Sequence, residues 1–306
     1  MTANTQNAPL SKQPTKNNPT ENEAMKKHNP THRAPRSGFT LLELLAVITI
    51  ISILMSLILV AIGGAMRKAR NAQVSAEITR LETSISNFKN EYGIEPWSEV
   101  VLTEDPSATG WRASSKTKLR RMFGSFTFSG QIDFNDDGVF TGDTTGTAGL
   151  GTGEIQLTAS ECLVFFLGGM PNNGTVIGFS KNPLSPFNKT STSRTDVLFS
   201  FQADKLVDQD GDGMPEYLDA SDGQTTPYHF ASSNNGQGYT AGVGHYLDGS
   251  GLPWNRDTHQ IISPGEDGIL GPNTPITPVY TPETELTGNR LEEADNITNF
   301  SGGTLN

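Results

Sequence analysis

Cysteine is almost absent from this chain of 306 residues, which contains a single one, Cys162. One cysteine cannot form an intrachain disulfide, so such cross-links are excluded as a source of stability. Cys162 lies in the apolar run Ser160–Gly168, where a free cysteine behaves as a small hydrophobic residue. We therefore expect Cys162 to be a core residue rather than a reactive thiol.

Sequence motifs of catalysis are also missing. Residues 93–306 contain three histidines, His229, His245 and His259, and none has the H-E-x-x-H spacing of a zinc protease. The sequence has neither a G-x-S-x-G nucleophile elbow nor a phosphate-binding G-x-x-x-x-G-K-[ST] loop. These absences predict a protein that is not an enzyme.

Large apolar residues are scarce in residues 1–38, which are rich in Asn, Thr, Pro and Lys. Such a segment cannot bury enough surface to offset the entropy of ordering, so we expect it to be disordered. Six of the 22 Lys and Arg residues and two of the 33 Asp and Glu residues lie here. Without this basic segment the chain would carry 16 bases and 31 acids, a net charge of −15, which disfavours nucleic acid as a partner.

The chain does have one long apolar run, Phe39–Ala65, of 27 residues. As a helix it would be about 40 Å long, and a bilayer core of about 30 Å needs roughly 20 residues. Residues 39–65 are therefore predicted to be the transmembrane half of an N-terminal helix. A signal peptide that ends near Ala61–Ala65 is the alternative, although its apolar region is usually shorter. Basic residues flank both ends of the run and do not determine its orientation.

A single carboxylate, Glu43, stands near the start of this apolar run. A charge at membrane depth is costly, so Glu43 is a candidate functional residue. Thr40-Leu-Leu-Glu43 also fits a capping box, in which the two side chains close the helix N-terminus. Both interpretations stay open, and they are compatible with each other.

Residues 66–95 are predicted to be the amphipathic half of the same helix. Apolar residues recur at helical spacing, with polar residues on the other faces: Val74, Ile78, Leu81, Ile85, Phe88 and Tyr92. Gly93 and Pro96 indicate where the helix stops. This stripe is short for a coiled coil, so we expect it to pack against the chain's own downstream sheet.

The segment Gly38-Phe39-Thr-Leu-Leu-Glu43 resembles the processing site of type IV pilins and pseudopilins. The resemblance implies that a prepilin peptidase cuts between Gly38 and Phe39 and methylates the new N-terminus. Residues 1–38 would then be a cleaved leader. The resemblance also implies that Glu43 pairs with the Phe39 ammonium of a neighbouring subunit during filament assembly, since an unpaired buried charge is costly.

The same resemblance implies an α+β fold, the pilin lollipop: a long N-terminal helix packed on a small antiparallel sheet. The protein would cross the inner membrane once, with the soluble C-terminal domain of residues 93–306 in the periplasm. In that domain Ser160–Gly168 reads as a short buried helix. Short strands are predicted between turn signals, at Asp196–Gln202, Pro227–Phe230 and Gln260–Ser263.

The domain's loops are long, and metal ions could hold them in place of disulfides. The segment that begins at Asp208 has glycine at its sixth position, Gly213, which allows the sharp turn of a calcium loop. Oxygen ligands stand at positions 1, 3, 5, 9 and 12: Asp208, Asp210, Asp212, Glu216 and Asp219. The sequence therefore predicts a Ca2+ site, with Asp219 where EF-hands have a glutamate. An acidic surface turn without an ion is the alternative.

A second segment opens in the same way, with Asp133, Asn135, Asp137 and Gly138. It has Thr144 at position 12, with Asp143 beside it. We expect Ca2+ here too, although the pattern is less complete.

The third candidate site comes from a further resemblance. Ile262–Gly268 and Glu293–Phe300 are similar to the C-terminal region of the major pseudopilin of type II (general) secretion. In that family the region forms a calcium-binding loop, which implies Asp267 and Asp295 as ligands. About twenty residues, Pro272–Arg290, separate two halves that lie close together in the family.

Together these patterns predict a structural subunit of a type II secretion-like pseudopilus, assembled from the inner membrane as a calcium-stabilised filament. The implied partners are further copies of the chain, minor pseudopilins, the prepilin peptidase and the inner-membrane assembly platform. A type IV pilus pilin for adhesion or DNA uptake is one alternative. A membrane-anchored calcium-binding protein that does not polymerise is the other.

Overall fold

The computed structural model describes residues 38–143, 147–221, 223–271, 278–282 and 284–305. The predicted disordered leader, apart from Gly38, lies outside the described residues. The chain divides into two compact units, one up to Ser56 and one from Leu57 onward. Helices and small antiparallel sheets occur together, as expected for an α+β protein.

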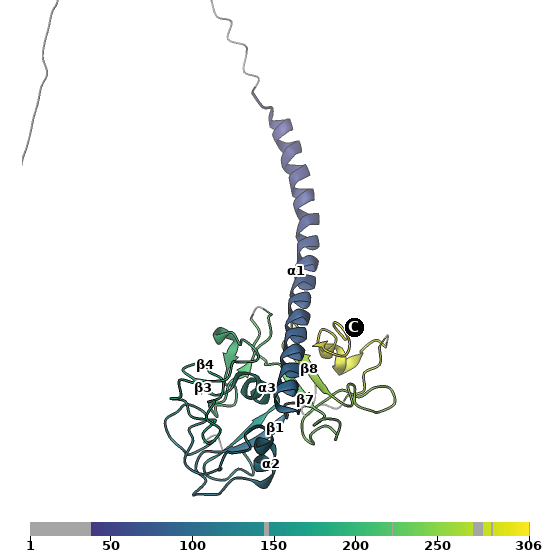
Figure 1. Ribbon diagram of the computed structural model, residues 1–306. Coiled ribbons are helices and arrows are strands. Elements are labelled where there is room, and N and C mark those ends of the chain that lie inside the picture. Colours follow the sequence, from purple (N-terminus) through teal and green to yellow (C-terminus); the bar gives the residue numbers. More distant parts are fainter. Residues whose placement is uncertain (1–37, 144–146, 222, 272–277, 283, 306) are drawn as a thin grey trace, which may run out of the picture. The chain divides into compact units, whose positions relative to one another are not determined.

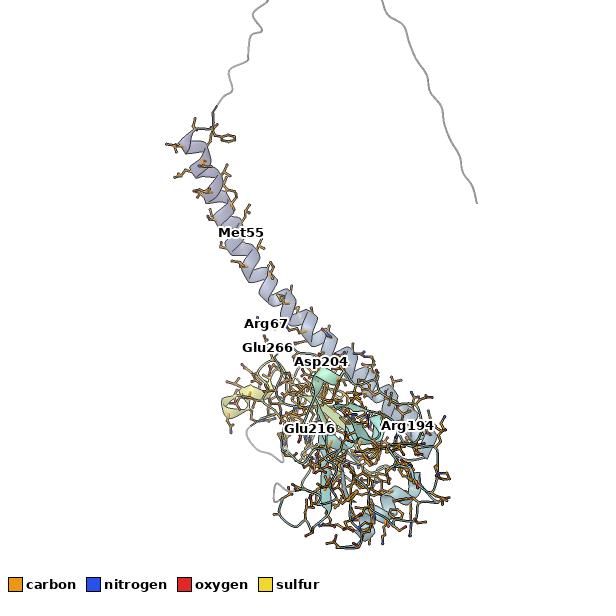
Figure 2. The ribbon with its side chains drawn as sticks, turned by 90° about the vertical axis from the view of Figure 1, so that its left-hand side faces the viewer. Met55, Arg67, Arg194, Asp204, Glu216 and Glu266 are labelled. Carbon is orange, nitrogen blue, oxygen red and sulfur yellow. The ribbon has the colours of Figure 1, made fainter. Side chains whose placement is uncertain are left out.

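Helix α1, Leu41–Tyr92, contains 52 residues and matches the single long helix expected from the sequence. By length and composition it is a helix that could cross a membrane. In the first unit its large apolar side chains are exposed, and Figure 2 shows side chains extending from the helix around Met55. The hydroxyls of Thr49, Ser52 and Ser56 donate to carbonyls of the same helix, which satisfies them without water.

The second part of α1 buries the stripe expected from the sequence. Val74, Ile78, Leu81, Ile85 and Phe88 are each at most 2 % exposed and belong to the main core. Helix α3, Ala159–Gly168, lies beside this part of α1 and supplies Phe166, whose ring centroid is 5.7 Å from that of Phe88 (Figure 1). The stripe is buried within the chain, as expected, but the contact of Phe88 is with a helix, α3, rather than with the predicted sheet.

Buried polar contacts also hold α1 in the second unit. Glu77 is only 1 % exposed, and its carboxylate accepts hydrogen bonds from the hydroxyls of Tyr217 (3.0 Å) and Tyr228 (2.8 Å). The Ser84 hydroxyl donates to the Leu198 carbonyl at 2.8 Å. These bonds fix the rotation of α1 about its axis, which apolar packing alone does less specifically.

In the described part of the chain the strands form four small antiparallel sheets rather than the single sheet expected. β1 (Glu99–Thr103) pairs with β2 (Glu154–Thr158), β3 (Pro171–Asn172) with β4 (Thr175–Val176), and β5 (Leu206–Val207) with β6 (Glu216–Tyr217). The three-stranded sheet contains β7 (His229–Ser232), β8 (His259–Ser263) and β9 (Ile297–Thr298), with β8 in the centre. Helix α2 is Ala113–Met122, and the 3-10 helices are η1 (Ala203–Lys205) and η2 (Gly288–Glu293).

The predictions for the buried helix at Ser160–Gly168 and for strands at Pro227–Phe230 and Gln260–Ser263 agree with α3, β7 and β8 to within two residues. The strand predicted at Asp196–Gln202 was wrong. Phe199 and Phe201 are both buried, which explains the alternating pattern. The backbone N–H groups of Leu198 and Phe199 donate to the Leu167 carbonyl at the end of α3 instead of joining a ladder.

An aromatic cluster fills the main core. Phe165 of α3 lies within 6.4 Å of the ring centroids of Phe134, Phe166, Phe179 and Phe187. Cys162 is fully buried beside them, and burial raises the pKa of its thiol well above the ordinary value. The expectation that Cys162 is a core residue is therefore confirmed. A smaller second core contains Tyr246, Ile262, Tyr280, Leu286 and Leu305.

Phe88→Ala tests how far the domain depends on α1. Removal of a buried ring that contacts α3 should lower the free energy of unfolding by about 3–5 kcal/mol. Urea unfolding of the full chain in detergent, followed by tryptophan fluorescence, measures the change. Asn87→Ala, at the exposed neighbouring position, is the matched control. An equal shift of the urea midpoint in both variants would contradict this role of the stripe.

Candidate functional site

The processing motif lies at the N-terminal end of α1. Residues 38–40 precede the helix, Phe39 is 84 % exposed, and nothing lies within 4 Å of a Cβ built on Gly38. The Glu43 carboxylate accepts from the Thr40 backbone N–H at 2.9 Å, and the Thr40 hydroxyl accepts from the Glu43 N–H at 3.2 Å. The capping box expected from the sequence is therefore present.

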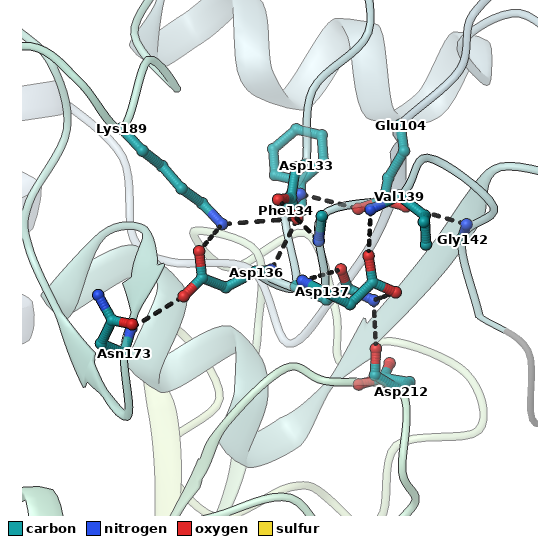
Figure 3. A network of polar contacts seen from close by, with 12 residues as sticks. Glu104, Asp133, Phe134, Asp136, Asp137, Val139, Gly142, Asn173, Lys189 and Asp212 are labelled. Atoms are coloured by element: carbon teal, nitrogen blue, oxygen red, sulfur yellow. Dashed lines mark hydrogen bonds and ion pairs between the residues drawn. The ribbon is translucent and has the colours of Figure 1, made fainter.

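Two acidic loops in the second unit have the same internal hydrogen bonds. In the first, Asp133 accepts from the N–H groups of Asp136 (2.7 Å) and Gly138 (3.2 Å). Asn135 accepts from the Asp137 N–H, and Asp137 from the Val139 N–H. The spacing of the polar side chains thus folds the backbone around them (Figure 3).

The second loop repeats this pattern residue for residue. Asp208 accepts from the N–H groups of Gly211 (2.8 Å) and Gly213 (3.1 Å). Asp210 accepts from the Asp212 N–H at 3.4 Å, and Asp212 from the Met214 N–H at 2.7 Å. The sequence similarity between the two segments therefore reflects the same turn.

The two loops lie against each other. The Asn135 side-chain amide donates to the Asp212 carbonyl at 3.0 Å (Figure 3). Gly213 has a φ of +86°, and a Cβ at this position would lie 2.7 Å from Cβ of Asn135. Glycine at the sixth position is thus required both by the turn and by the neighbouring loop.

Charges are balanced differently in the two loops. In the first, the Lys189 ammonium lies 3.6 Å from Asp133 and 2.9 Å from Asp136 (Figure 3). The amide of Asn135 also donates to Asp137 at 3.2 Å. Lys189 therefore offsets part of the negative charge of this loop.

The second loop faces another carboxylate instead. Oxygens of Asp210, Asp212 and Glu161 all lie within 4.8 Å of one another, and Glu161 and Asp212 are 2 % and 4 % exposed. Glu161 is on α3, where one of its oxygens accepts the Thr158 N–H at 2.8 Å. Its other oxygen, Oε1, is buried and has no hydrogen-bond partner in the part of the chain that the structure describes.

The pKa values of the carboxylates in and around this cluster follow from their burial and their closeness to one another. Burial, together with neighbouring carboxylates, raises the pKa of Glu161 well above its ordinary value. The same two causes raise the pKa of Asp212 to about 7 and that of Glu216 to about 7. Asp208 is among the charges that act on Asp212 and Glu216. The arrangement concentrates negative charge and oxygen ligands, which suits a hard cation.

Asp219 contacts a different set of groups. It is fully buried, and its carboxylate accepts from the Ser263 hydroxyl, from the Ser221 N–H at 2.8 Å and from the Gln224 amide at 3.2 Å. The structure therefore brings together Asp208, Asp210, Asp212 and Glu216 but directs Asp219 toward β8.

The third predicted pair, Asp267 and Asp295, does come together. Asp295 accepts from the N–H groups of Glu266 (2.6 Å) and Asp267 (3.1 Å). Gly265 makes this close approach possible, since a Cβ there would lie 2.6 Å from Cγ of Asp295. Burial raises the pKa of Asp267, and the charge of Asp295 adds to this effect. Two carboxylates suit calcium chemically, but here backbone amides already satisfy one of them.

Sequence reasoning missed Glu161, and it noted Asp143 only beside the Asp133 segment, not as a neighbour of the Asp208 loop. Asp143 is among the charges that raise the pKa of Asp210 and of Asp212. Thr158 and Glu161 form a capping box at the start of α3, and this signal marks a helix start rather than a ligand. Only the fold shows that Glu161 reaches the acidic loop.

Comparison with known proteins gives one match. Residues 33–59 match the family model described as the prokaryotic N-terminal methylation motif. No curated protein and no solved structure matches the chain. The match contains Gly38, Phe39 and Glu43 and covers the first part of α1. The chain therefore contains a prokaryotic N-terminal methylation motif, and this motif is typical of type IV pilins and pseudopilins.

Proposed function

We propose that this protein is a structural subunit of a type II secretion-like pseudopilus. The observation that carries the proposal is the methylation motif at residues 33–59, located where an exposed apolar helix begins. A prepilin peptidase would cut between Gly38 and Phe39, and the rest of α1 would anchor the chain in the inner membrane. The soluble domain would lie in the periplasm, and its role is structural rather than enzymatic.

Glu43 is the residue on which assembly depends in this proposal. In the uncut chain its carboxylate caps α1 through Thr40. Cleavage creates an ammonium group on Phe39, and a carboxylate in an apolar environment is stabilised by such a cation. Pairing with the Phe39 ammonium of a neighbouring copy would set the register of subunits as they enter a filament.

The exposed apolar side chains of α1 supply the remaining contact surface. Leu41, Leu45 and Ile48 are each more than half exposed. Lipid would cover them in the membrane, and helices of neighbouring subunits would cover them in a filament. Other copies of the chain, minor pseudopilins and the inner-membrane assembly platform are the partners proposed for this surface.

The secretion branch is favoured over its alternatives by the C-terminal region. Asp267 and Asp295 come together despite the insertion between them, as the resemblance to the major pseudopilin requires. A type IV pilin for DNA uptake would need a basic surface, whereas the mature chain is strongly acidic. A calcium-binding protein that does not polymerise is the remaining alternative.

Calcium is the second part of the proposal. The acidic loops lie in a domain that has a single cysteine and long connections. An ion bound by the Asp208 loop would offset the charge collected there, whereas Lys189 already serves the Asp133 loop. Calcium would thus hold these loops in place, as disulfides do in other proteins.

The Glu43→Ala variant distinguishes a role in filament assembly from a role in membrane insertion. The variant should still be inserted and processed but should be lost from sheared filaments, because the partner for the Phe39 ammonium is gone. Immunoblots of the sheared and membrane fractions measure this loss. Thr40→Ala is the matched control, since it removes the capping hydroxyl and keeps the carboxylate. Normal filaments from Glu43→Ala would remove Glu43 from the mechanism.

Removal of calcium should destabilise the second unit. An ion that binds only the folded state contributes about 2.7 kcal/mol when its free concentration is roughly 100 times Kd. A chelator should therefore lower the melting temperature of the full chain in detergent and speed proteolysis within residues 93–306. Excess calcium should restore both. Identical melting curves with chelator and with calcium would argue against calcium-held loops.

A further inference from the structure

We propose that Glu161 of α3 completes a calcium site with the loop Asp208–Glu216, in the place that sequence spacing assigns to Asp219. The inference deepens the calcium part of the proposed function. It does not depend on filament assembly, because every residue involved lies in the second unit.

The first argument is the unpaired oxygen. Oε1 of Glu161 is buried without a hydrogen-bond partner among the described residues. Glu161 belongs to the group in which carboxylate oxygens of Glu161, Asp210 and Asp212 lie within 4.8 Å of one another. An unsatisfied buried oxygen beside two further carboxylates is costly, and a cation bound between them would offset that cost.

The second argument is the lack of a cationic side chain. Within the described residues no Lys, Arg or His forms an ion pair with Glu161, Asp210 or Asp212. Another buried carboxylate shows the contrast: Glu95 also has an oxygen without a hydrogen-bond partner, but Lys89 lies 3.1 Å from its other one and His259 lies 3.9 Å from this one. Among the residues that the structure describes, the cluster around Glu161 has no such protein cation.

The third argument is the chemistry of the available ligands. All are oxygens, and Asp208 and Glu216 add two carboxylates close enough to act on the others electrostatically. Calcium prefers six to eight oxygen ligands and tolerates irregular geometry, which a loop and a helix N-terminus can supply together. Asp219 is unsuited to this role, because Ser263 and Gln224 already occupy its carboxylate.

Such a site would connect the loop to the core of the domain. Glu161 stands in the first turn of α3, whose residues Ser160–Gly168 are all buried. Tyr217 follows Glu216, donates its backbone N–H to the Ser160 hydroxyl and donates its own hydroxyl to Glu77 of α1. An ion at Glu161 would therefore hold β6 against α3 and support the contact between Tyr217 and α1.

Calcium titration calorimetry on the chelator-treated full chain in detergent tests the inference. Glu161→Gln keeps an oxygen for the Thr158 N–H but removes the charge, so the number of bound ions should fall by one, or the affinity of one site by roughly tenfold or more. Asp219→Asn should keep that ion. A wild-type number of ions in Glu161→Gln, or loss of the ion in Asp219→Asn alone, overturns the proposal.

A second pair of variants distinguishes loss of the ion site from misfolding of the variant chain. Asp210 is an exposed loop residue, so Asp210→Asn should fold and still lose the same ion. Asp204→Asn, at an exposed position outside the cluster, should bind as wild type does. A wild-type chain that binds no Ca2+ refutes both this site and the calcium proposal. Filament formation, scored separately, would be unaffected by that result.

Discussion

A change of surface along one helix is the constraint on which the rest of the molecule depends. α1 begins with apolar side chains on all sides and continues with a single apolar stripe, without a break in the helix. The first kind of surface is stable in lipid or against other helices, and the second requires a protein partner. The rest of the second unit supplies that partner through α3, Tyr217 and Tyr228. The methylation motif stands where this helix begins, so anchoring, processing and domain packing all act on one element.

The domain compensates for its lack of disulfides by aromatic packing and by buried carboxylates with specific partners. Glu77 binds two tyrosine hydroxyls, Glu104 accepts two backbone N–H groups at 2.8 and 2.9 Å, and Glu293 is held by Arg290 and Tyr246. Each of these carboxylates connects segments that are distant in the sequence. Among the described residues Glu161 has a neighbouring loop but no donor for one oxygen, and for this reason we propose it as a ligand rather than as a purely structural carboxylate.

Sequence patterns predicted the elements whose signal is local. The stripe of α1 and the apolar segments of α3 and β8 each indicate burial, and all three elements were confirmed. The strand at Asp196–Gln202 failed because burial of Phe199 and Phe201 needs an extended chain but not a ladder partner. Spacing correctly located the acidic turn at Asp208. It could not say which distant carboxylate faces that turn, since the choice between Asp219 and Glu161 depends on where α3 packs.

The central claim is that the chain is cut beside Gly38 and works from the new end. Mass spectrometry of the N-terminal peptide of protein purified from membranes tests this most directly. The account predicts a chain that starts at N-methylated Phe39 with Glu43 as its fifth residue. A mature chain that starts near Met66, or one that retains residues 1–38, would contradict it.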